Sequence, residues 1–341
     1  MDRASIPVPL SANTILQSSG YPIASSFTAQ AGAAIRVRLY KGMKRARYVL
    51  EWMMLVLARE MLGLLPWRVA IAIGAAAGEI AYRLGIRRRR VLANLSQAFP
   101  EWNARERRRL ARSVYHNVGR TMIEGLLLAR LSPDKVNQLV EGVEGFGFAE
   151  QVLATRRPFI VLTGHLGNWE LMGAYFASQG YRLKVFAKPL HNPLVEATLL
   201  SARRSLGLDM IYTGSGLKPA LRHLQDGGIL VFLADQDARR AGIAVSFFGV
   251  PASTVLGPAV FAHLARAPIL PVFAVRVGSI HHRFLIFPPI EPLPGEKREV
   301  AVERLTHAHV GVLEQVVRRY PEQYFWFHRR WKTRVEKLVR A

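Results

Sequence analysis

The segment from Pro158 to Glu170, PFIVLTGHLGNWE, combines a short apolar run with two residue types that can carry out acid and base chemistry. Residues 159–162 are bulky or β-branched, which is typical of a strand covered on both faces. His165 follows directly after Gly164, at the carboxyl end of this strand, where open α/β sheets usually hold their chemistry. We therefore predict that a base at His165 meets the carboxylate of Glu170 in the next helical turn. The alternative is a core histidine with an unrelated surface glutamate.

The spacing of this histidine and glutamate also occurs at two other places in the chain. His191 is followed by Glu196 behind a proline turn, and His309 is followed by Glu314 inside a continuous helical pattern. Neither pair follows a buried-strand pattern with a glycine that lets the backbone turn. The surrounding sequence therefore favours the first pair as the candidate site.

The composition limits the class of protein. The chain has 341 residues, 50% of them hydrophobic, which is enough for one large α/β domain or two small ones. It has no cysteine, which excludes a disulfide framework, thiolate zinc sites and a cysteine nucleophile. Basic residues number 47 against 24 acidic ones, a formal charge of +23. Such a charge predicts an anionic partner: nucleic acid, an anionic bilayer or a phosphorylated substrate.

Basic residues gather beside apolar segments near the N-terminus. One cluster precedes the apolar stretch 48–65, and a second, around residues 83–90, follows the apolar run 69–78. Charges interrupt the first stretch, and the second is shorter than the ~20 residues that a membrane helix needs. We predict that residues 43–90 form interfacial or membrane-anchoring helices whose arginines bind phosphate headgroups. A helical hairpin of a soluble core is the alternative.

The remaining sequence divides into two parts. Residues 1–35 lack helix or strand periodicity and are rich in small and polar residues, so we predict a disordered extension over residues 1–42. From residue 91 to 341 we predict one α/β domain, which begins with an amphipathic helix at 105–129 and a helix N-cap at Ser132. Strand patterns then alternate with helices, which predicts a mostly parallel or mixed sheet flanked by helices. The expected strands are 159–163, 183–187, 210–212, 229–233, 245–248, 269–277 and 284–287.

Several kinds of chemistry have no motif in this chain. The sequence contains no G-x-S-x-G elbow, no G-x-G-x-x-G, no Walker loop and no H-E-x-x-H. The pairs His281-His282 and His307-x-His309 lack the further ligands of a metal site, so no metal or cofactor is implied. Arg203 in a helical stretch and Asp235 after a predicted strand remain as groups that can bind phosphate or orient a hydroxyl. The alternative is a solvated arginine and a helix-capping aspartate.

From about residue 87 to 334 the chain resembles the lipid A biosynthesis acyltransferases, within the lysophospholipid acyltransferase superfamily. The resemblance lies in six motifs in the family's order, which is far more specific than the spacing of His165 and Glu170 alone. These are Asn94 with Phe99-Pro100-Glu101; His165 to Glu170; Asn192-Pro193-Leu194; Asp235-Gln236-Asp237; Phe247 to Ala252 with Thr254; and Pro321 to Tyr324 with Trp326, His328-Arg329-Arg330 and Lys332-Thr333-Arg334.

The resemblance implies a glycerolipid acyltransferase-like fold and a reaction. A fatty acyl chain would pass from an acyl carrier protein or coenzyme A thioester to a hydroxyl of a membrane glycolipid, such as a lipid A precursor. His165 would be the general base, and Glu170 would hold the other imidazole nitrogen. Arg203 would bind an anionic group, and Asp235 would position the catalytic loop. The expected location is the cytoplasmic face of the bacterial inner membrane, where an acidic carrier protein meets an anionic lipid.

Two positions depart from the common family pattern, and both concern the acceptor. Asn168 lies within Gly167-Asn168-Trp169, which resembles distant relatives that acylate other glycolipids, and Lys188 stands where arginine is common. We assign both residues to substrate binding. An acceptor such as a phosphatidylinositol mannoside or a lysophospholipid is therefore an alternative. A nucleic-acid-binding protein and a silent membrane scaffold are less favoured, because the basic clusters bracket lipophilic segments and the histidine and glutamate are intact.

Overall fold

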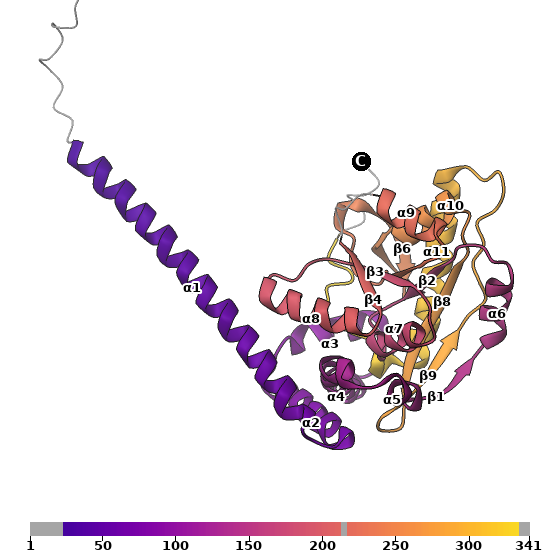
Figure 1. Ribbon diagram of the computed structural model, residues 1–341, viewed down its shortest axis with the longest axis horizontal. Helices are drawn as coiled ribbons and strands as arrows, with labels where there is room; N and C mark the ends of the chain where they lie inside the picture. The colour runs from indigo at the N-terminus through magenta and orange to yellow at the C-terminus, as the bar shows by residue number, and fades with distance from the viewer. Residues whose placement is uncertain (1–22, 213–216, 334–341) are drawn as a thin grey trace, which may run out of the picture. The chain divides into compact units, whose positions relative to one another are not determined.

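The computed structural model describes residues 23–212 and 217–333, with side chains from residue 43 onward. The chain divides into two compact units, Met1–Glu51 and Trp52–Ala341. Helix α1 (Ile23–Gly63) begins in the first unit and ends in the second (Figure 1). Residues 23–42 are helical where no regular structure was expected, because this stretch is rich in alanine and contains no proline. Residues 1–22 lie outside the described part.

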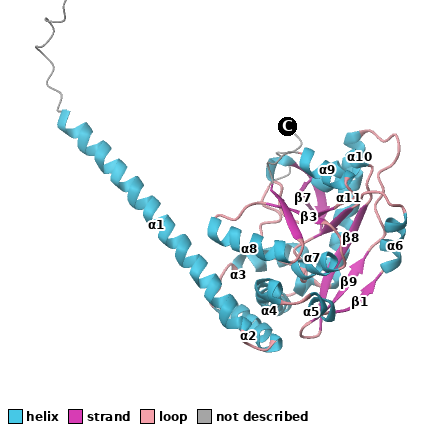
Figure 2. Ribbon diagram, viewed as in Figure 1, coloured by secondary structure: helices cyan, strands magenta, loops and turns pink. Residues whose placement is uncertain are grey.

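A seven-stranded sheet forms the centre of the second unit, with helices on both of its faces (Figure 2). Its strand order is β1-β9-β8-β2-β5-β3-β4, and every neighbouring pair is parallel except β8 with β9. This confirms the predicted mixed, mostly parallel sheet. A separate antiparallel hairpin contains β6 and β7. The strands are β1 (Val140–Glu144), β2 (Ile160–Thr163), β3 (Leu183–Ala187), β4 (Leu208–Tyr212), β5 (Ile229–Leu233), β6 (Gly242–Phe247), β7 (Val250–Val255), β8 (Ile269–Val277) and β9 (His281–Ile286).

Strand β2 lies in the middle of the sheet and is buried along its whole length. Its alternate residues face different clusters: Ile160 and Leu162 pack with α9, α10 and α11, whereas Val161 packs on the side of α6 and α7. Helices on both faces explain why β2 is an unbroken apolar run. Because β5 pairs with β2 from Ile160↔Leu230 to Thr163↔Leu233, the two strands end side by side.

The predicted strand positions agree best with the structure for strands of mostly apolar sequence. The predicted bounds of β3, β5 and β8 are those observed, whereas β4 begins two residues earlier. The segment expected at 245–248 belongs to the β6–β7 hairpin, outside the main sheet. Strands β1 and β7 were not expected, because VEGVE alternates with acidic residues and VPASTV carries a proline and small side chains.

Local sequence signals explain where several helices begin. Helix α4 starts at a capping box, in which the Asn103 side chain and the Glu106 side chain bond reciprocally to the backbone. Ser132 caps α5, as predicted. The other helices of the second unit are α2 (Trp67–Arg83), α3 (Arg88–Ala98), α4 (Ala104–Leu127), η1 (Leu128–Arg130), α5 (Pro133–Gln138), α6 (Phe146–Ala154), α7 (Trp169–Ser178), α8 (Pro193–Ser205), α9 (Lys218–Gln225), η2 (Arg239–Ala241), α10 (Gly257–Ala265), α11 (Arg298–Arg319) and η3 (Pro321–Gln323).

Helices α2 and α4 approach each other closely because glycines line their contact. A β-carbon on Gly74 would lie 2.6 Å from the carbonyl oxygen of Gly119, so neither helix could keep this position with a larger residue there. The part of α1 in the second unit is held by Trp52, whose Nε1 donates to Thr198 of α8 at 3.0 Å. Within the described residues no single helix is long and apolar enough to cross a membrane, although α2 and α3, bent by 91°, pass together on length and composition.

Candidate active site

A tight turn carries His165 from the end of β2 to the start of α7. Gly167 in this turn has φ +59°, and a β-carbon there would collide with the carbonyl oxygen of Ala274 on β8. Asn168 then caps α7 by accepting a hydrogen bond from the Leu171 backbone at 3.0 Å. The sequence G-H-L-G-N therefore folds as a compact strand-to-helix connection whose bend requires glycine. It places His165 at the carboxyl edge of the sheet, as predicted.

The partner of His165 is Asp235, which follows the neighbouring strand β5. One oxygen of Asp235 lies 2.7 Å from His165 Nδ1, and the other accepts a hydrogen bond from the His165 backbone at 3.0 Å. The aspartate side chain is fully buried, whereas that of the histidine is 22% exposed. Asp235 therefore fixes the orientation of the ring while Nε2 remains the nitrogen available for proton transfer.

The electrostatics of this pair stabilise the protonated, positively charged form of His165. Burial by itself would lower the pKa of His165, but the charge of Asp235 and its hydrogen bond outweigh burial and raise this pKa. Burial likewise would raise the pKa of Asp235, yet the charge of His165 lowers it well below its usual range. Asp235 thus remains ionised and stabilises the imidazolium.

Glu170 does not hold the imidazole, which corrects the expected pairing. Its carboxylate receives two hydrogen bonds from Arg203 of α8, at 3.1 Å from Nε and 2.5 Å from Nη2. Burial would lower the pKa of Arg203, but the hydrogen bond to Glu170 raises it, so the guanidinium stays charged. The spacing alone could not reveal this, because Glu170 lies in the first turn of α7 and faces α8, whereas Asp235 lies on the strand beside β2. Its negative charge still contributes to the raised pKa of His165.

A cavity of about 600 Å³ opens beside His165 at the carboxyl edge of the sheet. Glu170, Arg203 and Lys188 line it together with His165. The side chain of Gln236 also lies there, with Nε2 at 3.5 Å from Nε2 of His165. Most of the remaining wall is apolar: Val161, Met172, Phe176, Leu183, Val185, Phe186, Leu190, Leu208, Met210, Val231, Phe232, Leu233, Val255 and Phe261. A base and charged groups at one part of a largely apolar cavity fit a substrate with a reactive polar group and a hydrocarbon chain.

Of the other predicted substrate-binding residues, one lines the cavity and two are buried outside it. Lys188 is exposed and lines the cavity, consistent with a role in binding. Asn168 is 1% exposed and does not line it, and both polar atoms of its side chain bond within the protein, to Leu171 and to Glu124. Asp235 is buried behind His165. Asn168 therefore supports the loop, rather than contacting substrate as expected, and Asp235 positions the base in the catalytic loop, as the resemblance implied.

The two other histidine and glutamate pairs with the same spacing do not form such a site. His309 is buried in α11, where burial lowers its pKa to about 3, while Glu314 bonds to Arg318 and to the backbone of Phe248. Glu196 bonds to the backbone of Leu190. Context around the motif, and not its spacing, distinguished His165 as the histidine of the candidate site, although its partner is Asp235 and not Glu170.

The segment after α11 also holds His165 in place, and sequence reasoning did not assign it a role at the site. The backbone of Phe325 donates to the carbonyl of His165 at 2.8 Å, and its ring lies 6.1 Å from the imidazole. Tyr324 Oη donates to the carbonyl of Asp235 at 3.4 Å and contacts His328 Nε2 at 3.1 Å. The family motif from residue 321 to 334 marked this segment in the sequence. No local sequence pattern, however, predicts that the segment lies beside His165.

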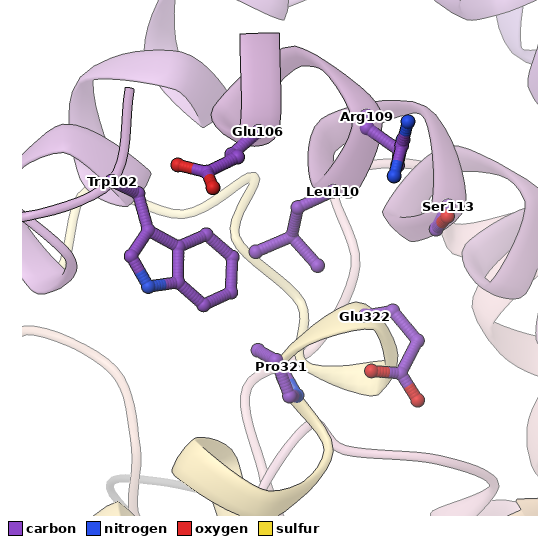
Figure 3. A pocket seen from close by; sticks show the side chains of 7 residues that line it. All are labelled: Trp102, Glu106, Arg109, Leu110, Ser113, Pro321 and Glu322. Atoms are coloured by element: carbon purple, nitrogen blue, oxygen red, sulfur yellow. The ribbon is translucent and has the colours of Figure 1, made fainter. Parts of the chain in front are cut away.

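A second hollow lies apart from the residues around His165. It has a volume of about 380 Å³ and lies between α4 and η3 (Figure 3). Its lining combines an indole, two carboxylates and one guanidinium, from Trp102, Glu106, Arg109, Leu110, Ser113, Pro321 and Glu322. Across residues 23–212 and 217–333, no three histidine, aspartate or glutamate side chains come together as ligands for a metal ion.

A buried aspartate, a partly exposed imidazole and a largely apolar cavity at the edge of a mixed α/β sheet can activate a hydroxyl beside a hydrocarbon chain. The model of the family "Bacterial lipid A biosynthesis acyltransferase" matches residues 39–333. The chain therefore belongs to this family.

Individual relatives share about a quarter of their residues with this chain. Lipid A biosynthesis acyltransferase 1 of Shigella flexneri is 28% identical, over 86% of this chain and 90% of its own length. Lipid A biosynthesis lauroyltransferase of Escherichia coli (strain K12) is 27% identical, over 80% and 88%. Phosphatidylinositol mannoside acyltransferase of Mycobacterium tuberculosis (strain CDC 1551 / Oshkosh) is 23% identical, over 60% and 64%. Among solved structures, 1-acyl-sn-glycerophosphate acyltransferase from Thermotoga maritima covers 75% of this chain and 97% of its own, with 18% identity and a TM-score of 0.33.

Proposed function

We propose that this acyltransferase moves a fatty acyl chain from an acyl carrier protein or coenzyme A thioester to a hydroxyl of a lipid A precursor. The observation that carries the proposal is the His165–Asp235 pair at the polar part of a largely apolar cavity. The family and the names of the relatives from Shigella and Escherichia support lipid A as the acceptor class.

The chemistry follows from the orientation of the imidazole. Nε2 of His165 takes the proton of the acceptor hydroxyl as its oxygen attacks the thioester carbonyl. Asp235, bound to Nδ1, stabilises the imidazolium that forms. Collapse of the tetrahedral intermediate breaks the carbon–sulfur bond, and His165 returns the proton to the leaving thiolate. The products are an ester and a free thiol, and the chain has no cysteine that could carry an acyl intermediate.

Charged groups in the cavity have a separate role in binding. Glu170 holds Arg203 through two of its three guanidinium nitrogens, which leaves Nη1 to bind an anionic group of donor or acceptor. Lys188, exposed in the same cavity, supplies a second positive charge. A phosphorylated acceptor or a phosphopantetheine-bearing donor provides the anion that these two cations require.

We also propose that residues 53–86 bind the cytoplasmic face of the inner membrane. Large apolar side chains are exposed along the end of α1, along α2 and directly after both helices, where Leu64 is 76% and Leu84 is 73% exposed. Arginines lie beside them, including Arg59, Arg68 and Arg83, and arginine next to an exposed apolar surface suits anionic phospholipid headgroups. The full apolar surface comprises Met53, Met54, Leu57, Met61, Leu64, Leu65, Val69, Ile73, Ile80, Leu84 and Ile86.

The experiment for the reaction is mass spectrometry of lipid A from a strain that lacks late acylation. Expression of the protein is expected to add one acyl chain, and His165→Ala, expressed at an equal level, is expected to add none. Retained acylation by His165→Ala would rule out the proposed base. If the wild-type protein leaves lipid A unchanged, the acceptor is wrong, and a phosphatidylinositol mannoside, the substrate class in the name of the mycobacterial relative, is the next acceptor to assay.

A further inference from the structure

A charged pair is buried between α4 and β8, close to the loop that carries His165. Glu124 of α4 is fully buried, and the side chain of Arg276 on β8 is 3% exposed. Both guanidinium ends bond to the carboxylate, with 2.5 Å between Arg276 Nη1 and Oε1 of Glu124. Burying such a pair is costly, because each ion loses its hydrating water. The buried pair is therefore weak evidence that the interaction stabilises the fold.

The buried carboxylate also binds the loop of the base directly. Asn168 Nδ2 donates to Oε2 of Glu124 at 2.8 Å. One helical turn earlier on α4, the hydroxyl of Thr121 donates to the carbonyl of Gly167 at 3.1 Å. Gly167 and Asn168 follow His165 by two and three residues. Side-chain hydrogen bonds from α4 therefore fix the position of the catalytic turn relative to this helix.

Arg276 is tied to the same turn from the opposite side. Its backbone N–H donates to Oε1 of Gln323 at 2.7 Å, and Gln323 Nε2 donates back to the Arg276 carbonyl at 3.0 Å. The carbonyl of Gln323 in turn accepts from the backbone of Gly167 at 3.0 Å. Three segments far apart in sequence, α4, β8 and η3, thus converge on the turn after His165.

The carboxylate of Glu124 is charged, and the neighbouring imidazole of His282 is neutral. Burial would raise the pKa of Glu124, but the hydrogen bonds from Arg276 lower it, so the carboxylate is ionised. His282 lies with Nε2 at 3.6 Å from Glu124, and burial lowers its pKa, so this imidazole is neutral. The Glu124 carboxylate therefore bonds to one guanidinium, that of Arg276, while the charge of Arg120 also acts on both groups. Asn168 occupies one of the remaining acceptor positions of the carboxylate.

We propose that the Glu124–Arg276 pair is a positioning clamp, which acts through Asn168 to hold the His165 loop so that Nδ1 meets Asp235 and Nε2 faces the cavity. The clamp rests on the proposed role of His165 as the base. The three side chains touch no substrate and are positioning residues. Their value lies in geometry, because a base displaced by about 1 Å can lose on the order of 100-fold in rate.

The test distinguishes a positioning role from a role in folding by removing only the hydrogen bond between Asn168 and Glu124. Substituting Glu124 by alanine would leave Arg276 buried without a counter-ion and unfold the protein, so Asn168→Ser is preferred. Serine retains an oxygen that can cap α7, but its shorter side chain cannot reach Glu124. In the full-length enzyme, with a thioester donor and lipid A precursor, we expect kcat to fall about 10- to 100-fold with an unchanged KM for the donor.

The pH profile supplies a readout that a loss of stability would not move. Asp235, Glu170 and His328 interact electrostatically with His165, and the charged groups of Arg203, Lys188 and Asp237 line the same cavity. The charge of Asp235 raises the pKa of the base. A loop released from the clamp moves His165 away from Asp235, so the acid limb of kcat should shift to lower pH in Asn168→Ser. A folding defect alone would reduce the amount of active enzyme and leave the limb where it is.

A matched control exists on the outer contact of α2 and α4. Glu79 binds Arg83, Arg112 and His116, so it pairs with arginine and lies beside a histidine as Glu124 does, but these contacts do not reach the His165 loop. Glu79→Gln should lower the melting temperature and leave kcat and the acid limb unchanged. Wild-type kcat and an unmoved limb in Asn168→Ser would overturn the clamp, provided His165→Ala is inactive in the same assay. Activity in His165→Ala would instead overturn the proposed base.

Discussion

Two regions near His165 each carry a carboxylate, and they differ in what that carboxylate does. At the end of β5, Asp235 is fully buried and binds the imidazole at 2.7 Å. In the first turn of α7, Glu170 is 23% exposed, lines the cavity and binds Arg203. A buried acceptor fixed to one ring nitrogen orients a base, whereas a carboxylate in a cavity holds a cation where a ligand can reach it. The nearer residue in sequence is therefore not the partner of the base.

The largest expected effect distinguishes the two carboxylates directly. Asp235→Asn should reduce kcat by about 10³- to 10⁴-fold, because the amide cannot stabilise the imidazolium and favours the wrong tautomer of His165. Single-turnover transfer from a labelled thioester would measure the loss. A kcat within about tenfold of wild type would show that Asp235 does not orient the base.

The Glu170 region should respond more weakly and in a different constant. Glu170→Gln removes the charge that holds Arg203 but retains an oxygen that accepts its hydrogen bonds, so we expect KM for the anionic substrate to rise about 10-fold and kcat to fall less. Steady-state kinetics with donor and acceptor varied in turn would show which substrate is affected. A loss of kcat as large as that of Asp235→Asn would reverse the comparison.

The pH dependence sharpens the same comparison. His165 acts as a base only when neutral, and its folded pKa is raised above the usual value, so activity should be lost as the pH falls through this raised pKa. Removing the charge of either carboxylate lowers the pKa of His165 and moves this acid limb to lower pH. Profiles of kcat for Asp235→Asn and Glu170→Gln should show the larger shift for Asp235, whose charge acts more strongly on the ring. An equal or greater shift for Glu170 would contradict the assigned geometry.

Substitutions in the apolar surface of residues 53–86 should have the smallest effect on the acyl-transfer rate. Leu57→Ser combined with Met61→Ser should weaken binding to vesicles of anionic phospholipid, by roughly 10-fold for each large apolar side chain that no longer enters the lipid. Turnover of a detergent-dispersed substrate should not change, because neither residue lines the cavity. Co-sedimentation with vesicles measures the binding.

A control variant distinguishes this surface from general loss of apolar area. Leu264 of α10 is 43% exposed and lies outside residues 53–86. Leu264→Ser should leave vesicle binding unchanged. Equal weakening by both sets of substitutions would argue against a membrane-binding role for the N-terminal helices.

Strands of mostly apolar sequence were predicted best, because their signal is local. β3, β5 and β8 carry runs of apolar residues that can be recognised without knowing what covers them. β1 was missed because VEGVE at the edge of the sheet has no such run. The helix at 23–42 was missed because weak periodicity was read as disorder, although alanine favours helix even where no apolar face forms.

The sequence predicted which residues belong to the candidate site better than it predicted which of them bond to each other. His165, Glu170, Arg203 and Lys188 all line one cavity, as a shared site requires. The role of Asn168 was misjudged, because a polar residue beside a site can bind substrate or support the residues that do. Asp235 was expected to position the catalytic loop, and it bonds to the backbone and the ring of His165 in that loop. Burial decides between these roles, and burial is a property of the folded chain.

By itself the sequence determined that a histidine ends a buried strand, that a glycine turn follows it and that the motifs are those of an acyltransferase family. These features depend on residues close together in the chain, so their types and order suffice. Only the tertiary structure decided that Asp235 meets His165, that Glu170 meets Arg203 and that Glu124 and Arg276 hold the turn. Each of these contacts joins atoms 33 to 152 residues apart, and strand order and helix packing bring them within hydrogen-bond distance.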